Sequence, residues 1–327
     1  MKDEIRWGIV GPGNIAHSFA KDLRMVNGGR LTAVASRNFD RASSFAAEYG
    51  AAHVYGSYQE LFESDEVDVL YIATPHTSHC ELTLQALRHK KAVLCEKPMG
   101  INKQEVDRMV SAAKEGDVFL MEALWSRFNP AIRKVKQLIE EGVIGKLEYL
   151  YADFGFYALD RDEKGRLLNP DLAGGSLLDI GIYPIFLSYL FFGMPKHIKA
   201  SSRFHTTGVE MQTSMLFEYQ NGQALLYSGL TSKSEMKAEI SGQEGTLFLH
   251  PRWHEAQGYS LEKENELTHV DLPTVGKGYS HEIEEVQECL RAGKKESDRW
   301  SLQNSQDLVA LLDAVRKETG ITFPFEE

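Results

Sequence analysis

Cysteine is scarce in this sequence. Three cysteines stand at positions 80, 95 and 289 of 327 residues. Disulfide-rich domains and cysteine-based metal sites need more cysteines at closer spacing, so both are excluded, and the usage fits a reducing compartment. The first ten residues, MKDEIRWGIV, also lack the basic and apolar regions of an export signal. We therefore expect a cytoplasmic protein.

Long apolar runs and an excess of positive charge are missing as well. The apolar stretches are too short and too interrupted by polar residues to span a bilayer. The chain has 36 Lys and Arg against 47 Asp and Glu, a net charge of -11. Because an acidic protein has no general attraction to phosphate backbones or acidic membranes, we expect neither nucleic acid nor a membrane as a partner.

Short apolar runs alternate with helical periodicity through the first 120 residues. The runs are IRWGIV, LTAVAS, VDVLYIAT, AVLCEKP and VFLMEA. This alternation is typical of a parallel sheet covered by helices, and it predicts an α/β fold. Ligands of such sheets bind at the carboxyl ends of the strands, so the residues that follow each run are the candidates for function.

The first run is followed by a G-x-G-x-x-A motif, formed by Gly11, Gly13 and Ala16. Glycine at the first two positions allows a tight turn and a close approach of the backbone. A pyrophosphate can then lie on the helix N-terminus, at Asn14 and Ile15. Glycines also mark ordinary turns, but this motif follows a strand and opens a helix. It predicts a dinucleotide site of the Rossmann type.

The second run ends at Ser36, and Arg37 and Arg41 follow it. NAD-binding domains usually place an acidic residue here for the ribose hydroxyls, whereas a 2′-phosphate needs positive charge. A guanidinium binds phosphate in a bidentate way, and Ser36 can add a hydrogen bond. Two solvated arginines at a helix start are the alternative. We favour NADP(H), with NAD as the second choice.

The third run leads into IATPHTSHCE. Pro75 can set the geometry of this loop, while Thr74, His76 and His79 could reach a nicotinamide or its ribose. The two histidines and Cys80 also suit zinc, but no complementary ligand cluster follows at the usual spacing. We predict a loop that lines the cofactor, and no metal.

The fourth run ends in LCEKPMG, where Glu96 and Lys97 precede Pro98. A lysine at this end of a parallel strand can stabilise a developing alkoxide or lower the pKa of a neighbouring phenol. An ion pair with Glu96 is the alternative. That pair is geometrically awkward, because adjacent residues of a strand point to opposite faces.

The order of G-x-G-x-x-A, ATPHTSH, EKP and MEALWSRFNP resembles the glucose-fructose oxidoreductase and inositol dehydrogenase family, Gfo/Idh/MocA. The similarity extends from about Arg6 through the final helix. EKPMGIN, FLMEALWSRFNP and GGSLLDIGIYP look most like its dimeric dihydrodiol dehydrogenase branch, which has NADP-dependent sugar dehydrogenases as bacterial relatives. The resemblance implies that Lys97 is catalytic and that Glu96 lies at the cofactor.

The remainder of the chain has strand composition followed by two helical patterns. Asn221-Gly222, between two strand-like runs, is a strong hairpin signal. We predict a Rossmann domain over residues 1–122 and an α+β domain with a large, mostly antiparallel open sheet over residues 123–327. The resemblance implies that this sheet pairs subunits into a homodimer or a higher homo-oligomer.

GGSLLDIGIYP supplies candidates for proton transfer. Asp179 and Tyr183 are four residues apart, which places them on one face if the stretch is helical. The residues alone favour a core tyrosine with a capping aspartate. The resemblance implies instead that Tyr183 is the acid/base, with its pKa lowered from about 10 by Lys97, and that Asp179 orients the lysine or the substrate hydroxyl.

Trp125, Arg127, Phe154 and Tyr157 are candidate walls of a substrate pocket, although each alone is more often a core residue. An aromatic wall suits the apolar face of a sugar ring or a cyclic diene diol. Two functional classes follow: an oxidoreductase of sugars, polyols or trans-dihydrodiols, and a non-catalytic regulator that senses a dinucleotide. Intact Lys97, Asp179 and Tyr183 favour the enzyme.

Overall fold

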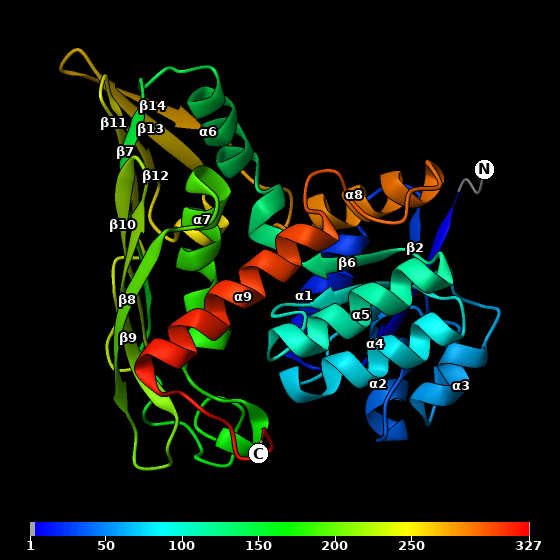
Figure 1. The fold of residues 1–327 in the computed structure, drawn as a ribbon. Helices are drawn as coiled ribbons and strands as arrows, with labels where there is room; N and C mark the ends of the chain where they lie inside the picture. Colours follow the sequence, from blue (N-terminus) through cyan, green and yellow to red (C-terminus); the bar gives the residue numbers. More distant parts are fainter. Residues whose placement is uncertain (1–3, 327) are drawn as a thin grey trace. The chain divides into compact units, whose positions relative to one another are not determined.

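The computed structural model describes residues 4–326, which form two compact units (Figure 1). The first unit contains the residues up to Phe128 together with Val275–Gln306. The second contains Asn129–Thr274 and the residues from Asp307 onward. The return of residues 275–306 to the first unit has no signal in the sequence pattern. The boundary predicted between residues 122 and 123 stays a prediction.

The first unit contains a six-stranded, entirely parallel sheet in the order β3-β2-β1-β4-β5-β6. This is the order of doubly wound dinucleotide-binding sheets, and the five apolar runs are all strands. The strand that the sequence analysis missed, β3, has only three residues. The strands are β1 (Ile5–Val10), β2 (Gly29–Ala35), β3 (His53–Tyr55), β4 (Val69–Ile72), β5 (Ala92–Glu96) and β6 (Leu120–Ala123).

Side-chain caps start most of the helices around this sheet. Asn38 accepts the backbone N–H of Arg41 at the start of α2, and Asn102 accepts that of Glu105 at the start of α5. The start of α1 differs, because its N-cap is Gly13 and no side chain caps it. The helices are α1 (Asn14–Leu23), α2 (Phe39–Tyr49), α3 (Tyr58–Glu63), α4 (His79–Arg88) and α5 (Lys103–Gly116).

A buried carboxylate ties residues 275–306 to the first unit. Asp22, on α1, is 2% exposed and accepts the backbone N–H groups of four consecutive residues at distances of 2.8 to 3.3 Å. Those residues, 277–280, lead into α8 (Ser280–Arg291). A negative charge at a helix N-terminus satisfies N–H groups that have no partner within the helix. Helix α8 is therefore a full member of this unit.

The second unit contains an eight-stranded sheet in the order β14-β13-β12-β11-β7-β10-β9-β8. Every neighbouring pair is antiparallel except β7 and β10, which confirms the predicted architecture. Gly222 pairs with Tyr219 at the predicted hairpin. The strands are β7 (Leu147–Gly155), β8 (His197–Phe204), β9 (Glu210–Tyr219), β10 (Gly222–Gly229), β11 (Ala238–Gly242), β12 (Thr246–Leu249), β13 (Gly258–Lys263) and β14 (Glu266–Asp271).

Helices cover one face of this sheet. Helices α6 (Pro130–Glu140) and α7 (Ile182–Phe192) lie along it, and Figure 1 shows no helix of the unit on the opposite face. Side chains alternate accordingly: Phe217 and Ala224 are fully buried, whereas Leu225 is 44% exposed. The last helix, α9, is Leu302–Thr319. One sheet face is thus a core and the other is a surface.

One helical stretch, Pro170–Phe192, is long and apolar enough to be tested as a membrane span, with a mean hydropathy of 1.5. Its apolar window is 83% buried inside the protein, as in the core helix of a water-soluble fold. The stretch contains α7 and the turn before it, so its apolar residues are used for packing against the sheet.

Candidate active site

The glycine turn after β1 leaves room for a ligand at the start of α1. Gly11 has a φ of +87°, which favours glycine, and a Cβ there would lie 2.8 Å from the side chain of Thr74. A Cβ added at Gly13 would meet nothing within 4 Å. The uncapped N-terminus at Asn14 and Ile15 therefore borders open space, as the N–H groups of a phosphate-binding helix do.

The end of β2 brings positive charge beside this turn. The backbone N–H of Gly11 donates to the carbonyl of Ala35 at 3.1 Å, which joins the turn to the strand. Ser36 is buried and accepts the N–H of Asn38 at 3.1 Å. Arg37 and Arg41 are both exposed. Two guanidinium groups therefore stand near the place where the ribose of a dinucleotide is held in such sheets.

The end of β4 carries a hydroxyl that lacks a protein partner. Thr74 Oγ1 is buried and has no hydrogen-bond partner among the described residues. Buried hydroxyls are normally satisfied, so an unpaired one points to a ligand or a bound water. Thr74 also contacts the glycine turn, as its nearness to Gly11 indicates. The turn, the arginines and this hydroxyl together fit a dinucleotide.

His79 lies inside the first unit. The ring is fully buried, with Nδ1 2.8 Å from the carbonyl oxygen of Pro98 and Nε2 2.9 Å from that of Thr74. Burial lowers the pKa of His79, and a neutral imidazole donates only one N–H, so it can satisfy one carbonyl at a time. The ring ties the loop after β4 to the loop after β5.

The other residues of this loop are more accessible. Pro75 is exposed, and His76 is half-buried with its ring 5.8 Å from that of His79. Between residues 4 and 326 no group of three or more His, Cys, Asp and Glu side chains could hold a metal ion. The predicted cofactor contacts of Pro75, His76 and His79 stay predictions.

Glu96 anchors the end of β5 while Lys97 leaves it. The backbone N–H of Lys97 donates to Glu96 Oε2 at 3.1 Å, and the Tyr71 hydroxyl donates to Glu96 Oε1. Burial, followed by the nearby Glu96 charge, raises the pKa of Tyr71 well above its usual value, so Tyr71 remains a donor. Glu96 is 5% exposed and Lys97 is half-buried. Glu96 therefore fixes the end of the strand through its hydrogen bonds, and Lys97 is the first residue beyond that end.

Trp125 and Arg127 lie in a short 3-10 turn, Trp125–Phe128, after β6. The Trp125 ring stacks on that of Tyr279, with ring centroids 4.9 Å apart. Arg127 Nε donates to the carbonyl of Arg299 at 2.8 Å. Both contacts join the turn to residues 275–306, which the sequence analysis did not connect with it. The predicted substrate contacts of Trp125 and Arg127 stay predictions.

In the second unit, Asp179 lies in a π-helical turn, Leu177–Gly181, directly before α7. The stretch is helical, which was the condition for placing Asp179 and Tyr183 on one face, but the α-helical rule for a spacing of four does not hold across a π turn. Asp179 is 7% exposed, and Arg166 Nη1 donates to its Oδ1 at 2.7 Å. The sequence analysis missed Arg166, which is one of several charged residues in a surface loop.

Tyr183, in the first turn of α7, lies within a cluster of rings. Its centroid is 5.4 Å from that of Phe154 and 5.6 Å from that of His254, and the rings of Phe154 and His254 stack at 4.1 Å. The structure therefore brings together Tyr183 and Phe154, both predicted site residues. Tyr157 is 54% exposed and takes no part in these ring contacts. His254 was missed because it is 71 positions away in the sequence.

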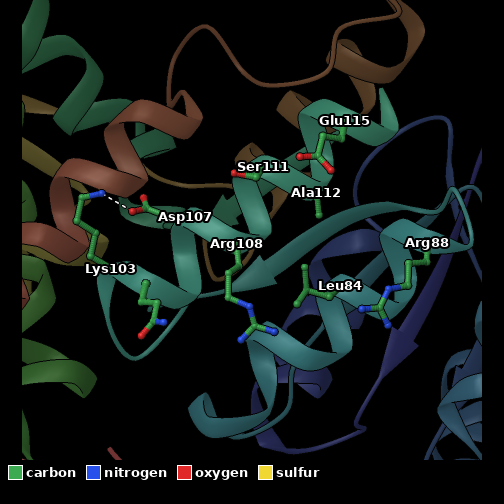
Figure 2. A pocket seen from close by; sticks show the side chains of 9 residues that line it. Leu84, Arg88, Lys103, Asp107, Arg108, Ser111, Ala112 and Glu115 are labelled. Atoms are coloured by element: carbon green, nitrogen blue, oxygen red, sulfur yellow. Dashed lines mark hydrogen bonds and ion pairs between the residues drawn. The ribbon is translucent and has the colours of Figure 1, made fainter.

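A surface hollow of about 640 Å³ lies between α4 and α5 (Figure 2). Figure 2 shows Arg88 on one helix and Arg108 on the other, with Lys103 paired to Asp107. The residues that line the hollow all belong to α4 and α5, and none of them is a predicted site residue. Its lining contains both positive and negative side chains, so the hollow favours neither an anionic nor a cationic ligand. The carboxyl ends of the parallel strands remain the better candidate for the active site.

Two family models match the chain. The model described as "Oxidoreductase family, NAD-binding Rossmann fold" matches residues 5–124, and that described as "GFO/IDH/MocA C-terminal domain" matches residues 132–248. Trans-1,2-dihydrobenzene-1,2-diol dehydrogenase of Mus musculus is 39% identical over 333 residues, 98% of each chain. The human protein of the same name is 36% identical, again over 98% of each chain.

Solved structures of oxidoreductases are also similar to this chain. A 3-ketoreductase from Actinomadura kijaniata, solved with NADP and TDP-benzene, is 29% identical, has a TM-score of 0.87 and covers 97% of this chain and 98% of its own. An aldose-aldose oxidoreductase from Caulobacter crescentus shares the fold, with a TM-score of 0.89 at 22% identity over 97% of this chain and 98% of its own.

The chain therefore belongs to the Gfo/Idh/MocA family of oxidoreductases. The predicted family, fold class, oxidoreductase activity and nicotinamide cofactor are confirmed. The alternative of a non-catalytic regulator has no support among these relatives. The roles of individual residues stay predictions.

Proposed function

We propose that this protein transfers a hydride reversibly between NADP(H) and a secondary alcohol or ketone of a cyclic diol, polyol or sugar. The observation that carries the proposal is the edge of the six-stranded sheet, where the two arginines, the glycine turn, Thr74 and Lys97 follow the consecutive strands β2, β1, β4 and β5. A dinucleotide and a cationic side chain at one sheet edge suit hydride transfer to a carbonyl.

NADP is preferred over NAD because of charge at the end of β2. Ser36, Arg37 and Arg41 would hold the 2′-phosphate, and Gly11, Gly13, Asn14 and Ile15 the pyrophosphate. Thr74 would donate its hydroxyl to the cofactor. When bound, the nicotinamide supplies the hydride acceptor or donor. The NADP present in the structure of the 3-ketoreductase supports the same preference.

The substrate class follows from the relatives and from the rings around Tyr183. The relatives are named for a trans-diol of a dihydrobenzene ring, and the 3-ketoreductase was solved with TDP-benzene. Phe154 and His254 offer flat surfaces beside Tyr183, which suit the apolar face of a six-membered ring. Trp125, Arg127 and Tyr157 are further candidates for substrate contacts.

Lys97, Asp179 and Tyr183 have separate tasks in this proposal. In reduction, the Tyr183 hydroxyl donates its proton to the ketone oxygen; in oxidation, the phenolate takes the proton of the alcohol. The Lys97 ammonium group offsets the charge that develops on that oxygen. Asp179 orients the hydroxyl of the substrate, and Arg166 holds its carboxylate in place.

We also propose that two copies pair through the open face of the eight-stranded sheet. Leu216, Leu225 and Tyr151 occupy consecutive strands in one register on that face. Apolar surface of this kind usually marks an interface, and a second copy presents the same row. The three cysteines are unpaired and buried, which supports a cytoplasmic location. The net charge of -11 supports the proposal that neither nucleic acid nor a membrane is a partner.

Absorbance at the reduced-nicotinamide band tests the function. Purified protein would be mixed with NADP or NAD and a panel of trans-diols, pentoses, hexoses and their ketones. We expect turnover with one substrate class, and with NADP in preference to NAD. Lys97→Ala should abolish the signal, and Lys114→Ala, an exposed lysine on α5, should leave it unchanged. Tight NADPH binding without turnover on any compound would contradict the proposal.

A further inference from the structure

A buried carboxylate lies at the start of the helix that carries Asp179 and Tyr183. Glu210, the first residue of β9, is 2% exposed, and its Oε1 accepts the backbone N–H of Leu177. A Cβ at Gly175 would overlap this carboxylate, and Gly175 has a φ of +119°. Only glycine therefore allows the carboxylate to lie directly against the chain that enters the π turn.

The partners of Glu210 are neutral. Its carboxylate also receives hydrogen bonds from the backbone and hydroxyl of Ser176, and the Ser176 hydroxyl is 3.0 Å from that of Ser228 on β10. Strands β8 and β10 and the π turn pack against β9, and their charged or titratable side chains are His197, Lys199, Arg203, Tyr227 and Asp179. The hydrogen bonds to its carboxylate come from Leu177, from Ser176 and from its own backbone N–H, all of them neutral donors.

The proton affinity of Glu210 is unusual for a glutamate. Burial raises its pKa to about 7, although the N–H donors oppose this shift. Above that pH the ionised carboxylate makes charge-assisted bonds to the helix start, where the helix dipole also favours a negative charge. Below it the neutral carboxyl group is a weaker acceptor. The helix start is then held less firmly.

A core position in a strand does not need a carboxylate, and burying one costs stability unless it is well bonded. Glu210 is therefore better explained by what it holds. Asp179 is two residues beyond Leu177, and Tyr183 follows in the same continuous helical stretch. A shift at Ser176 and Leu177 would move both side chains together.

We propose that Glu210 is a positioning residue, which sets the place of Asp179 and Tyr183 through the start of their helix. Because the ionised carboxylate is the stronger acceptor, this placement depends on the protonation state of Glu210. The catalytic part of this inference rests on the proposed function of those two residues. Glu210 itself touches the backbone of the helix start, so its effect on the reaction is indirect.

The first test compares Glu210→Gln with Glu218→Gln. Glu218 lies on the same strand, is half-buried and pairs with Lys199 at the surface. In the wild type, kcat for ketone reduction should fall as the pH drops through 7. Glu210→Gln should lower kcat at pH 8 roughly tenfold, the loss of one charge-assisted bond, and should remove this pH dependence. KM for NADPH should stay unchanged, and Glu218→Gln should behave as the wild type.

Hydrogen–deuterium exchange gives a second readout that does not need activity. After correction for intrinsic rates, peptides covering residues 176–192 of the wild type should exchange more slowly at pH 8 than at pH 6. Glu210→Gln should show no such difference. This comparison of the wild type at two pH values stands even if the variant folds poorly.

The two readouts separate the possible failures. Equal exchange at both pH values in the wild type would overturn the inference, as would a kcat profile that Glu210→Gln leaves intact. An exchange difference that depends on Glu210, in a protein without turnover on any substrate, would support the positioning role while refuting the proposed function.

Discussion

The two units hold their candidate reactive side chains in different ways. In the first, Lys97 follows a strand whose five residues are all buried, and Glu96 fixes the strand end through Tyr71. In the second, Tyr183 stands on a helix that packs on one face of a sheet, and Glu210 holds the start of that helix. A strand end thus presents the lysine, and a supported helix presents the tyrosine.

The two arrangements differ in how far apart in the sequence their supporting residues lie. The backbone N–H of Lys97 is held by the residue directly before it, Glu96, and the parallel sheet places the end of β5 beside the other strand ends. The helix of Tyr183 depends on Glu210, which is 27 positions further along the chain, and on Ser228 of the next strand. A substitution should therefore act on the first arrangement directly and on the second from a distance.

The largest effect should come from Lys97→Ala. Loss of one cation at a developing oxyanion lowers the rate about 10³-fold. The affinity for NADPH, measured by fluorescence titration, should change less than about threefold because no phosphate contact is lost. If Lys97→Ala keeps turnover within tenfold of the wild type, Lys97 has no role in the reaction despite its place at the strand end.

Tyr183→Phe should come next. Removal of a general acid lowers kcat about 10²-fold to 10⁴-fold, while the ring contacts with Phe154 and His254 remain. The control is Tyr189→Phe on the same helix, whose hydroxyl donates to Asp307 at 2.7 Å. That variant should lose thermal stability and keep turnover. Retained turnover in Tyr183→Phe would remove the tyrosine from the mechanism.

Arg37→Ala combined with Arg41→Ala should change only the affinity for the cofactor. Two charge-assisted contacts to the 2′-phosphate are lost, so the Kd for NADP should rise about 100-fold while that for NAD changes little. Arg30→Ala is the control, because Arg30 lies near the opposite end of β2 and pairs with Glu4. Equal weakening of both cofactors would contradict the assignment of the phosphate site.

The smallest effect on turnover should come from Leu225→Lys on the open sheet face. A charge at the centre of an apolar interface should convert a dimer into a monomer in light scattering, with kcat within about threefold of the wild type. Met194→Lys is the control, since Met194 is 49% exposed in the loop after α7. A dimer that survives Leu225→Lys would show that this face is not the interface.

Sequence patterns predicted the parts of the molecule that depend on neighbours in the chain. The glycine turn, the strand end at Lys97 and the hairpin at Asn221 are local, since each needs only a few consecutive residues. His254 and Glu210 escaped prediction because their contacts join segments that are distant in sequence. Arg166 escaped because it is one of several charged residues in a surface loop. The π turn escaped as well, since the α-helical and π-helical forms of one stretch share the same apolar pattern.

The four N–H groups that Asp22 accepts have a consequence for how the protein is made. Asp22 leaves the ribosome among the first residues, and its donors, residues 277–280, follow only when most of the chain has been synthesised. Until then a carboxylate destined for the interior must stay in water. The first unit therefore cannot be completed until residues 275–306 have been made, and vectorial folding cannot complete it from the N-terminal segment alone.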